Sequence, residues 1–247
     1  MSTTSTRERI YERHARAADR GSWSVERDVA WDRIDPVLAH RHPEVLDQVR
    51  EAAIVESFHP VNLGRLMRAT WDDLDAGVVF SLEAFEGFKH FHALRRYLEV
   101  VDYEPRITDA ELVEVRRAGA PLEIRPEELI RRLVDFMLSE HLAAYFFRRL
   151  ADRSDEPVLR DLLLRIAADE VRHAQSASDL LAKRIEADPA LVPEVLEAAA
   201  EFRHYGEEVV PELPVALEGD EIAIVTFAQR VERLCGVRLV EHMKADL

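Results

Sequence analysis

The stretch Ala168-Asp169-Glu170-Val171-Arg172-His173 places a carboxylate and an imidazole three residues apart inside a strongly helical run. Residues three apart leave a helix on the same face, about one turn from each other. A charged side chain on a buried face is costly unless it is paired or bound to a metal ion. Glu170 and His173 nevertheless fall on the apolar stripe of this helix, which is formed by Leu163, Ile166, Ala167, Ala174, Ala177 and Leu181.

Three other predicted helices carry a glutamate where an apolar residue is expected, namely Glu56, Glu86 and Glu140. We expect Pro60 to kink or break the first of them just beyond Glu56. The glutamates form two pairs, because Glu56 precedes Glu86 by 30 residues and Glu140 precedes Glu170 by the same 30. The four helices are predicted over residues 43–67 (in two pieces about Pro60), 77–101, 126–152 and 157–187.

Each second glutamate is followed within about one turn by a histidine, His90 or His173. The pattern is a helix–loop–helix unit that occurs twice, with a carboxylate aimed inward from every long helix. Such an arrangement is typical of the core of a ferritin-like dimetal bundle. We therefore predict an all-α protein, a ferritin-like four-helix bundle with additional N- and C-terminal helices.

The remaining segments are predicted from their composition. Residues 1–20 are polar and are expected to form a flexible N-terminal tail or one short exposed helix, and residues 21–247 to form one ferritin-like di-iron helical domain. The connection from 102 to 125 is irregular, with one short helix after Thr108-Asp109. Two more helices are expected near 190–205 and 219–244.

Composition excludes several classes of protein. The 247 residues include 48 Asp and Glu against 33 Lys and Arg, a net charge of −15, which argues against binding to nucleic acid. A single cysteine, Cys235, rules out a disulfide framework and a cysteine-rich metal site. No apolar run approaches the roughly 20 residues that span a bilayer, and no apolar signal core follows the N-terminus. We therefore expect a cytoplasmic protein that does not bind membranes.

Carboxylates and neutral imidazoles are the ligands that two iron ions (Fe²⁺/Fe³⁺) prefer. A lone E-x-x-H pair is more often an exposed polar pair on a helix, and the chain has three, so the prediction rests on the set. His59 is a rival ligand that ranks below His90 because it adjoins Pro60, and Glu201/His204 is assigned to the surface. The predicted metal ligands are Glu56, Glu86, His90, Glu140, Glu170 and His173, with Asp169 behind them orienting a ligand histidine.

The chain also resembles a known family, the soluble acyl-[acyl-carrier-protein] desaturases. Asp169-Glu170-Val171-Arg172-His173 is similar to the D-E-K-R-H motif of that family, and Glu140 to its lone glutamate on the preceding helix. Glu56 lies four residues before a proline, as the first ligand of the family does. The stretch from Ala228-Gln229-Arg230 to Leu234-Cys235-Gly236-Val237 is similar to an A-Q-R-L-G-V segment. The resemblance spans roughly residues 45–240.

The first metal motif departs from the family. Its E-E-N-R-H sequence falls on Glu86-Gly87-Phe88-Lys89-His90, so the ligand glutamate is replaced by Gly87. Glu86 still shares a helix face with His90 and is the expected substitute, with Glu83 as a second candidate. Ala143 stands where the family has a threonine. These departures keep oxygenation open beside desaturation.

The resemblance implies a nonheme di-iron oxidase that uses O₂ and two electrons to dehydrogenate an unactivated C–H bond of an aliphatic or acyl-carrier-bound substrate, as in fatty acid metabolism. It also implies a ferredoxin-like electron donor and a homodimer. Alternatives are a di-iron N-oxygenase or hydroxylase of a biosynthetic pathway, acting on a small organic substrate, and a non-catalytic iron-binding bundle. An acidic carrier protein would need a basic patch, for which the candidates are Arg116, Arg117, Arg125, Arg131 and Arg132.

Overall fold

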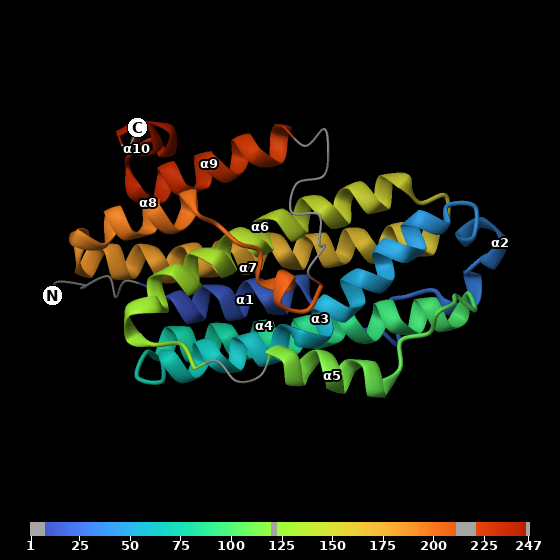
Figure 1. Ribbon diagram of the computed structural model, residues 1–247. Coiled ribbons are helices and arrows are strands. Elements are labelled where there is room, and N and C mark those ends of the chain that lie inside the picture. The colour runs from blue at the N-terminus through green and yellow to red at the C-terminus, as the bar shows by residue number, and fades with distance from the viewer. Residues whose placement is uncertain (1–7, 120–122, 211–220, 246–247) are drawn as a thin grey trace, which may run out of the picture.

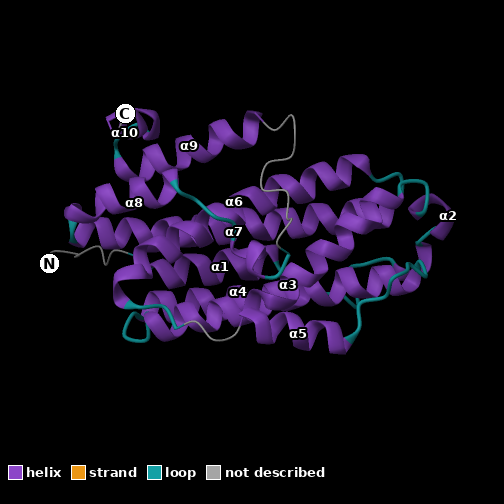
Figure 2. Cartoon of the chain, in the orientation of Figure 1, coloured by secondary structure: helices purple, strands orange, loops and turns teal. Residues whose placement is uncertain are grey.

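The chain is built from helices alone within the residues that the computed structural model describes, which are 8–119, 123–210 and 221–245. This confirms the predicted all-α class (Figure 2). The core consists of four long helices, and each covers the range in which its inward glutamate was predicted. They are α3 (Pro43–Ala69), α4 (Leu74–Val100), α6 (Leu129–Arg153) and α7 (Pro157–Ala187).

The four helices pack as two hairpins, α3 with α4 and α6 with α7. The short helix α5 (Asp109–Gly119), predicted after Thr108-Asp109, follows the first hairpin in the chain and lies on the outside of the bundle against α3 (Figure 1). Across the bundle, α3 contacts α6 and α4 contacts α7. One long connection between two hairpins is the topology of ferritin-like bundles.

Side-chain caps begin the second helix of each hairpin. Asp73 accepts hydrogen bonds from the backbone of Asp75 and Ala76 at the start of α4. Glu156, which is fully buried, accepts one from the Leu159 backbone at 2.7 Å at the start of α7, with Pro157 in the first turn. Short turns capped in this way hold consecutive helices antiparallel, which brings their glutamates to the same level.

The predicted break at Pro60 does not occur, because α3 is one helix from Pro43 to Ala69. A proline inside a helix removes one backbone hydrogen bond and crowds the preceding turn. Here Arg116 of α5 donates to the Ser57 carbonyl at 2.9 Å, so a carbonyl of that turn has an outside donor. Helix α3 thus continues past Pro60 and keeps Glu56 and His59 on one buried face.

The N-terminal segment contains a short helix, the alternative to a flexible tail in the sequence analysis. Residues 10–21 form α1 (Ile10–Gly21), which lies against α4 and α7, while residues 1–7 are outside the described range. Arg13 and His14 contact Asp179 of α7 at 2.6 and 2.7 Å. The alternation of charged residues suggested a solvated segment, but these charges have partners on the bundle.

The remaining elements cover the bundle. The predicted helices near 190–205 and 219–244 correspond to α8 (Val192–Ala200) and to two helices, α9 (Glu221–Cys235) and α10 (Leu239–Ala245). The chain turns between α9 and α10 at Gly236, whose φ of +69° favours glycine. The short elements are η1 (Trp31–Arg33), α2 (Pro36–Ala39), η2 (Pro126–Glu128), η3 (Pro189–Leu191) and η4 (Tyr205–Glu208).

The hydrophobic core has two apolar halves. One half includes Phe147 and Leu162, and the other includes Phe80 and Phe136. Buried polar residues lie on the four long helices between the two halves, where they are shielded from water. Among the described residues, every helix is too short or too polar to cross a lipid bilayer.

Candidate metal centre

Two groups of buried side chains in this polar layer have the donor atoms and the spacing of metal ligands. The first cluster is Glu56 of α3, His90 of α4 and Glu170 of α7. The second cluster is His59 of α3, Glu140 of α6 and His173 of α7. Within each cluster one ligand atom of every residue lies within 4.8 Å of those of the other two. The chemistry is oxygen and imidazole nitrogen, which suits iron and other first-row metals.

Glu170 joins the two clusters. Its Oε1 lies 2.9 Å from Nδ1 of His90, and its Oε2 lies 3.0 Å from Nδ1 of His173. Glu56 Oε2 lies 3.6 Å from the same His90 nitrogen, and Glu140 Oε2 lies 3.2 Å from the same His173 nitrogen. A carboxylate with one oxygen directed at each cluster has the geometry of a bridging ligand.

Several ligand atoms of the two clusters lack a hydrogen-bond partner. Buried polar groups in proteins are nearly always hydrogen-bonded, and a buried group without a partner costs free energy. Several such atoms converging on one point are therefore unfavourable unless a cation binds between them. In the described chain these unpartnered atoms include Glu56 Oε2, His59 Nε2, His90 Nδ1, Glu140 Oε1 and Glu170 Oε1.

Asp169 holds the far side of the His90 ring. Its Oδ2 lies 2.9 Å from Nε2 of His90 and accepts a hydrogen bond from Trp23 Nε1 at 2.8 Å. Lys89 Nζ lies 3.1 Å from the same oxygen, and Arg172 donates to Oδ1 at 2.7 Å. The contact with His90 is the one expected of a residue that orients a ligand histidine. It leaves Nδ1 of His90 directed at the first cluster.

Glu86 stands in the same relation to His173. Its Oε2 lies 2.9 Å from Nε2 of His173, and its Oε1 accepts a hydrogen bond from Arg172 at 2.7 Å. Glu86 was predicted as a metal ligand, but the structure places it outside both clusters, behind the imidazole. Arg172 therefore connects the two carboxylates, Glu86 and Asp169, that support the two histidines.

His59, which the sequence analysis ranked below His90 as a ligand, lies in the second cluster. Its ring is 1% exposed, its Nδ1 lies 2.8 Å from the Tyr205 hydroxyl, and its Nε2 has no partner. Glu56/His59, one of the three E-x-x-H pairs of the chain, thus contributes one residue to each cluster. The available signal was that Glu56 and His59 share a helix face, which an unbroken α3 preserves.

Burial and neighbouring charges set the pKa values of the metal-free centre. Burial lowers the pKa of His59 to about 4, so its ring is neutral near pH 7. Burial opposes protonation of His90 and His173, but the surrounding carboxylates outweigh it and raise both pKa values. Burial also raises the pKa of Glu56 and Glu140. A metal ion would replace the protons of these histidines, so its binding would release protons.

Glu83, the alternative to Glu86, lies one turn before it on α4. Its Oε1 accepts a hydrogen bond from Ser176 of α7, and its Oε2 is buried without a partner. Burial raises its pKa to about 8. Glu83 belongs to neither cluster, so the structure brings together five of the six predicted ligands and adds His59 to them.

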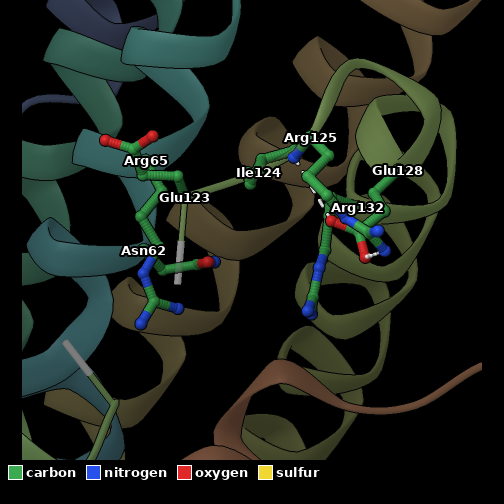
Figure 3. Close-up of a pocket in the computed structure, with 7 residues that line it drawn as sticks. All are labelled: Asn62, Arg65, Glu123, Ile124, Arg125, Glu128 and Arg132. Atoms are coloured by element: carbon green, nitrogen blue, oxygen red, sulfur yellow. Dashed lines mark hydrogen bonds and ion pairs between the residues drawn. The ribbon is translucent and has the colours of Figure 1, made fainter. Parts of the chain in front are cut away.

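A pocket of about 290 Å³ lies between the N-terminal half of α6 and the region of α3 that follows His59 (Figure 3). Arg65 of α3 and Arg132 of α6 line it together with Arg125 and Glu128. Of the arginines expected to meet an acidic carrier, only Arg125 and Arg132 reach this pocket. All five arginines have partners within the chain: Arg116 has Ser57, Arg117 has Glu114, Arg125 has Glu128, Arg131 has Glu201 and Arg132 has Glu208.

Comparison with known proteins supports a relationship to desaturases over part of the chain. The chain is 36% identical over 95 residues to the protein named "Putative acyl-[acyl-carrier-protein] desaturase DesA2" in each of two strains of Mycobacterium tuberculosis. The match covers 38% of this chain and only 34% of the relatives, so the chain spans about a third of the length of the curated proteins it matches. No family model matches the sequence.

Proposed function

We propose that this protein is a nonheme di-iron oxidase of the acyl-carrier-protein desaturase type, built on a ferritin-like bundle. The observation that carries the proposal is the pair of buried clusters joined by Glu170, in which several ligand atoms have no hydrogen-bond partner. The partial likeness to the named desaturase supports the same class of chemistry. Glu56, His90 and Glu170 would hold one iron ion, and His59, Glu140 and His173 the other.

Two iron ions bound there would supply the activation of dioxygen, with two electrons delivered from outside. Removing two hydrogen atoms from a –CH₂–CH₂– unit in this way consumes one O₂, two electrons and two protons, and yields an alkene and two waters. The protein contributes rigid ligands and a dry surrounding. Asp169 and Glu86 hold His90 and His173 in the orientation that the ions need. The apolar halves on both sides exclude bulk water.

The partners follow from the same proposal. The electrons would come from a ferredoxin-like donor, and the substrate would be an acyl chain or a small organic molecule, free or bound to a carrier protein. The pocket lined by Arg65, Arg125 and Arg132 is a candidate contact for an acidic carrier, which would have to compete with Glu128 and Glu208 for these arginines. A homodimer would cover the exposed Phe85 and Phe88 on the outer face of α4.

The test is reconstitution with Fe²⁺ without oxygen, followed by addition of O₂, a reducing system with ferredoxin, and stearoyl or palmitoyl carrier protein. We expect about two irons per chain and formation of an alkene. The variant Glu140→Ala should lose iron and product while keeping its helical circular dichroism. Asp152→Ala, a change of an exposed carboxylate on the same helix, should keep both. A Glu140→Ala protein with full iron content and full turnover would refute the assignment.

The mass of the product separates the alternatives. Loss of two hydrogen atoms identifies a desaturase, whereas gain of one oxygen atom identifies a hydroxylase or N-oxygenase that uses the same ligands. Iron uptake with ferroxidase activity, and no organic product from any substrate tested, would assign the protein to the non-catalytic iron-binding class.

A further inference from the structure

The two hairpins supply the centre in a matching way. On α4, Glu86 lies four residues before His90, and on α7, Asp169 lies four residues before His173. Each of these carboxylates contacts the histidine of the other hairpin, and both contacts measure 2.9 Å. The supporting carboxylates and ligand histidines of the two hairpins are therefore arranged equivalently, as in an approximate two-fold symmetry. Each position of α4 near the centre has an equivalent on α7.

This equivalence exposes a missing carboxylate. The residue of α7 that follows Asp169 is Glu170, which reaches both clusters. The equivalent residue of α4 is Gly87, which is buried and provides no ligand. The first hairpin thus lacks the counterpart of the bridging glutamate.

His59 fills the volume that a side chain at position 87 would need. A Cβ atom built on Gly87 would lie 2.4 Å from Cδ2, 2.9 Å from Cγ and 3.2 Å from Cβ of His59. Contacts below 3.0 Å are essentially never seen, so a side chain at 87 and the present His59 ring exclude each other. Glycine is needed at this position for close approach of another side chain rather than for its backbone conformation.

The ring of His59 is fixed by its surroundings. The Tyr205 hydroxyl of η4 lies 2.8 Å from Nδ1, and the rings of Phe136 and His173 lie 5.8 and 6.0 Å away, centroid to centroid. Nε2 is buried and free of any hydrogen bond. An outer partner on one nitrogen and an open second nitrogen is the arrangement of a metal-ligating histidine.

We propose that His59 replaces, from α3, the bridging carboxylate that position 87 of α4 would otherwise supply. This chain would then bind its two metal ions with three glutamates and three histidines. The inference rests on the dimetal centre proposed above and assigns Gly87 a specific role in it. The three carboxylates leave one positive charge of two divalent ions uncompensated, so the centre would bind a small anion more readily than one with four carboxylates.

A double-mutant cycle tests the exchange. His59→Ala removes the ligand, His59→Phe removes it but keeps a ring in the space, and the double variant His59→Ala/Gly87→Glu moves a carboxylate into the vacated volume. The double variant His59→Ala/Gly87→Ala fills the volume without a ligand. Gly77→Ala, on the same helix with nothing within 4 Å of the added Cβ, is the matched control for Gly87→Ala.

Metal content is measured by elemental analysis after loading with Co²⁺, and folding by circular dichroism. We expect about two metal ions in the wild-type protein and in Gly77→Ala. About one is expected in His59→Ala, His59→Phe and His59→Ala/Gly87→Ala, with a return to about two only in His59→Ala/Gly87→Glu. Gly87→Ala should bind the second ion more weakly than Gly77→Ala does, because the His59 ring must move. Azide should bind the metal-loaded wild type more tightly than the metal-loaded His59→Ala/Gly87→Glu protein.

Two full metal ions in both His59→Ala and His59→Phe would overturn the inference while leaving the dimetal centre intact. The same conclusion would follow if Gly87→Glu alone bound both ions as the wild type does, because the two side chains would then not exclude each other. No metal in the folded wild-type protein would instead reject the dimetal centre itself, and His59 as a ligand with it. Equal azide affinities would overturn the charge argument.

Discussion

Replacement of Asp169 by asparagine tests how much of the metal affinity depends on residues behind the ligands. In the structure Oδ2 of Asp169 accepts a hydrogen bond from Trp23 Nε1 at 2.8 Å and lies 2.9 Å from His90 Nε2. An asparagine oxygen in that place keeps these two contacts, but without charge. The amide NH₂ then occupies the position of Oδ1, where it faces Arg172 Nη2, 2.7 Å from the present oxygen. Two donors cannot bond each other, so Arg172 must move and the hold on His90 weakens.

The expected size follows from these contacts. A hydrogen bond to an ionised acceptor is roughly twice as strong as a neutral one, and loss of a partner behind a metal-bound histidine typically lowers affinity about 10- to 100-fold. This corresponds to about 1.4–2.7 kcal/mol. We expect the upper part of that range, because the substitution adds a donor–donor contact to the loss of charge. The weakened ion should be the one in the first cluster, since Glu86 still supports His173.

The assay is titration of the metal-free protein with Co²⁺ at pH 7 against a competing chelator, with the two binding steps resolved. Asp179→Asn is the matched control, because Asp179 lies on the same helix and contacts only Arg13, His14 and Gln175 among the described residues. It should leave both steps within about threefold of the wild type. An Asp169→Asn protein that binds both ions with wild-type affinity would refute the claim that Asp169 supports a metal-bound His90.

Three further predictions concern stability, and each is read from thermal or urea unfolding. Glu140→Gln should raise the melting temperature of the metal-free protein, because burial raises the pKa of Glu140 and disfavours its ionised carboxylate. The same variant should lose the stabilisation of about 2.7 kcal/mol that a metal ion at 100 times its Kd is expected to give the wild type. Burial raises the pKa of Asp135 to about 6, so its ionisation destabilises the fold as pH rises from about 4 to 6. The free energy of unfolding of Asp135→Asn should equal that of the wild type at pH 4 and exceed it by up to about 3 kcal/mol at pH 7. Equal free energies at pH 7 would contradict this. Phe80→Ala should lower the free energy of unfolding by about 3–5 kcal/mol, because the ring is fully buried. Phe85→Ala, on the same helix, should change it by less than about 0.5 kcal/mol, because that ring is 68% exposed. Similar losses in the two variants would contradict the packing.

The positions of the long helices were predictable because hydrophobic period, proline placement and capping residues act locally. The helix from Pro157 to Ala187 has the predicted bounds. The break expected at Pro60 was wrong, because α3 is continuous through this residue. Arg116, which is distant along the chain, donates to the Ser57 carbonyl in the adjoining turn, a contact that local sequence does not predict. The position of α1 against α4 and α7 also depends on partners distant in sequence, such as Asp179.

The candidate site also has residues that the sequence predicts and residues that only the packing of the helices places. The period of a helix is enough to place Glu56, Glu140, Glu170 and their histidines on inward faces, and the structure gathers them there. Glu86 was assigned to the metal by the same reasoning, since it shares a face with His90. Whether such a residue touches the ion or stands behind an imidazole depends on a few ångströms, which the position of Arg172 and His173 on α7 decides.

The amino-acid sequence by itself determined that this protein is an all-α bundle with carboxylates and histidines on buried helix faces, because those features depend on residue spacing along single helices. Only the tertiary structure decided which of these side chains meet. His59 lies against Gly87 because α3 and α4 pack closely at that level, and the two positions, 28 residues apart in the chain, compete for one volume. Competition for space between helices leaves no periodic signal in either helix, so it becomes visible only when the helices are packed together.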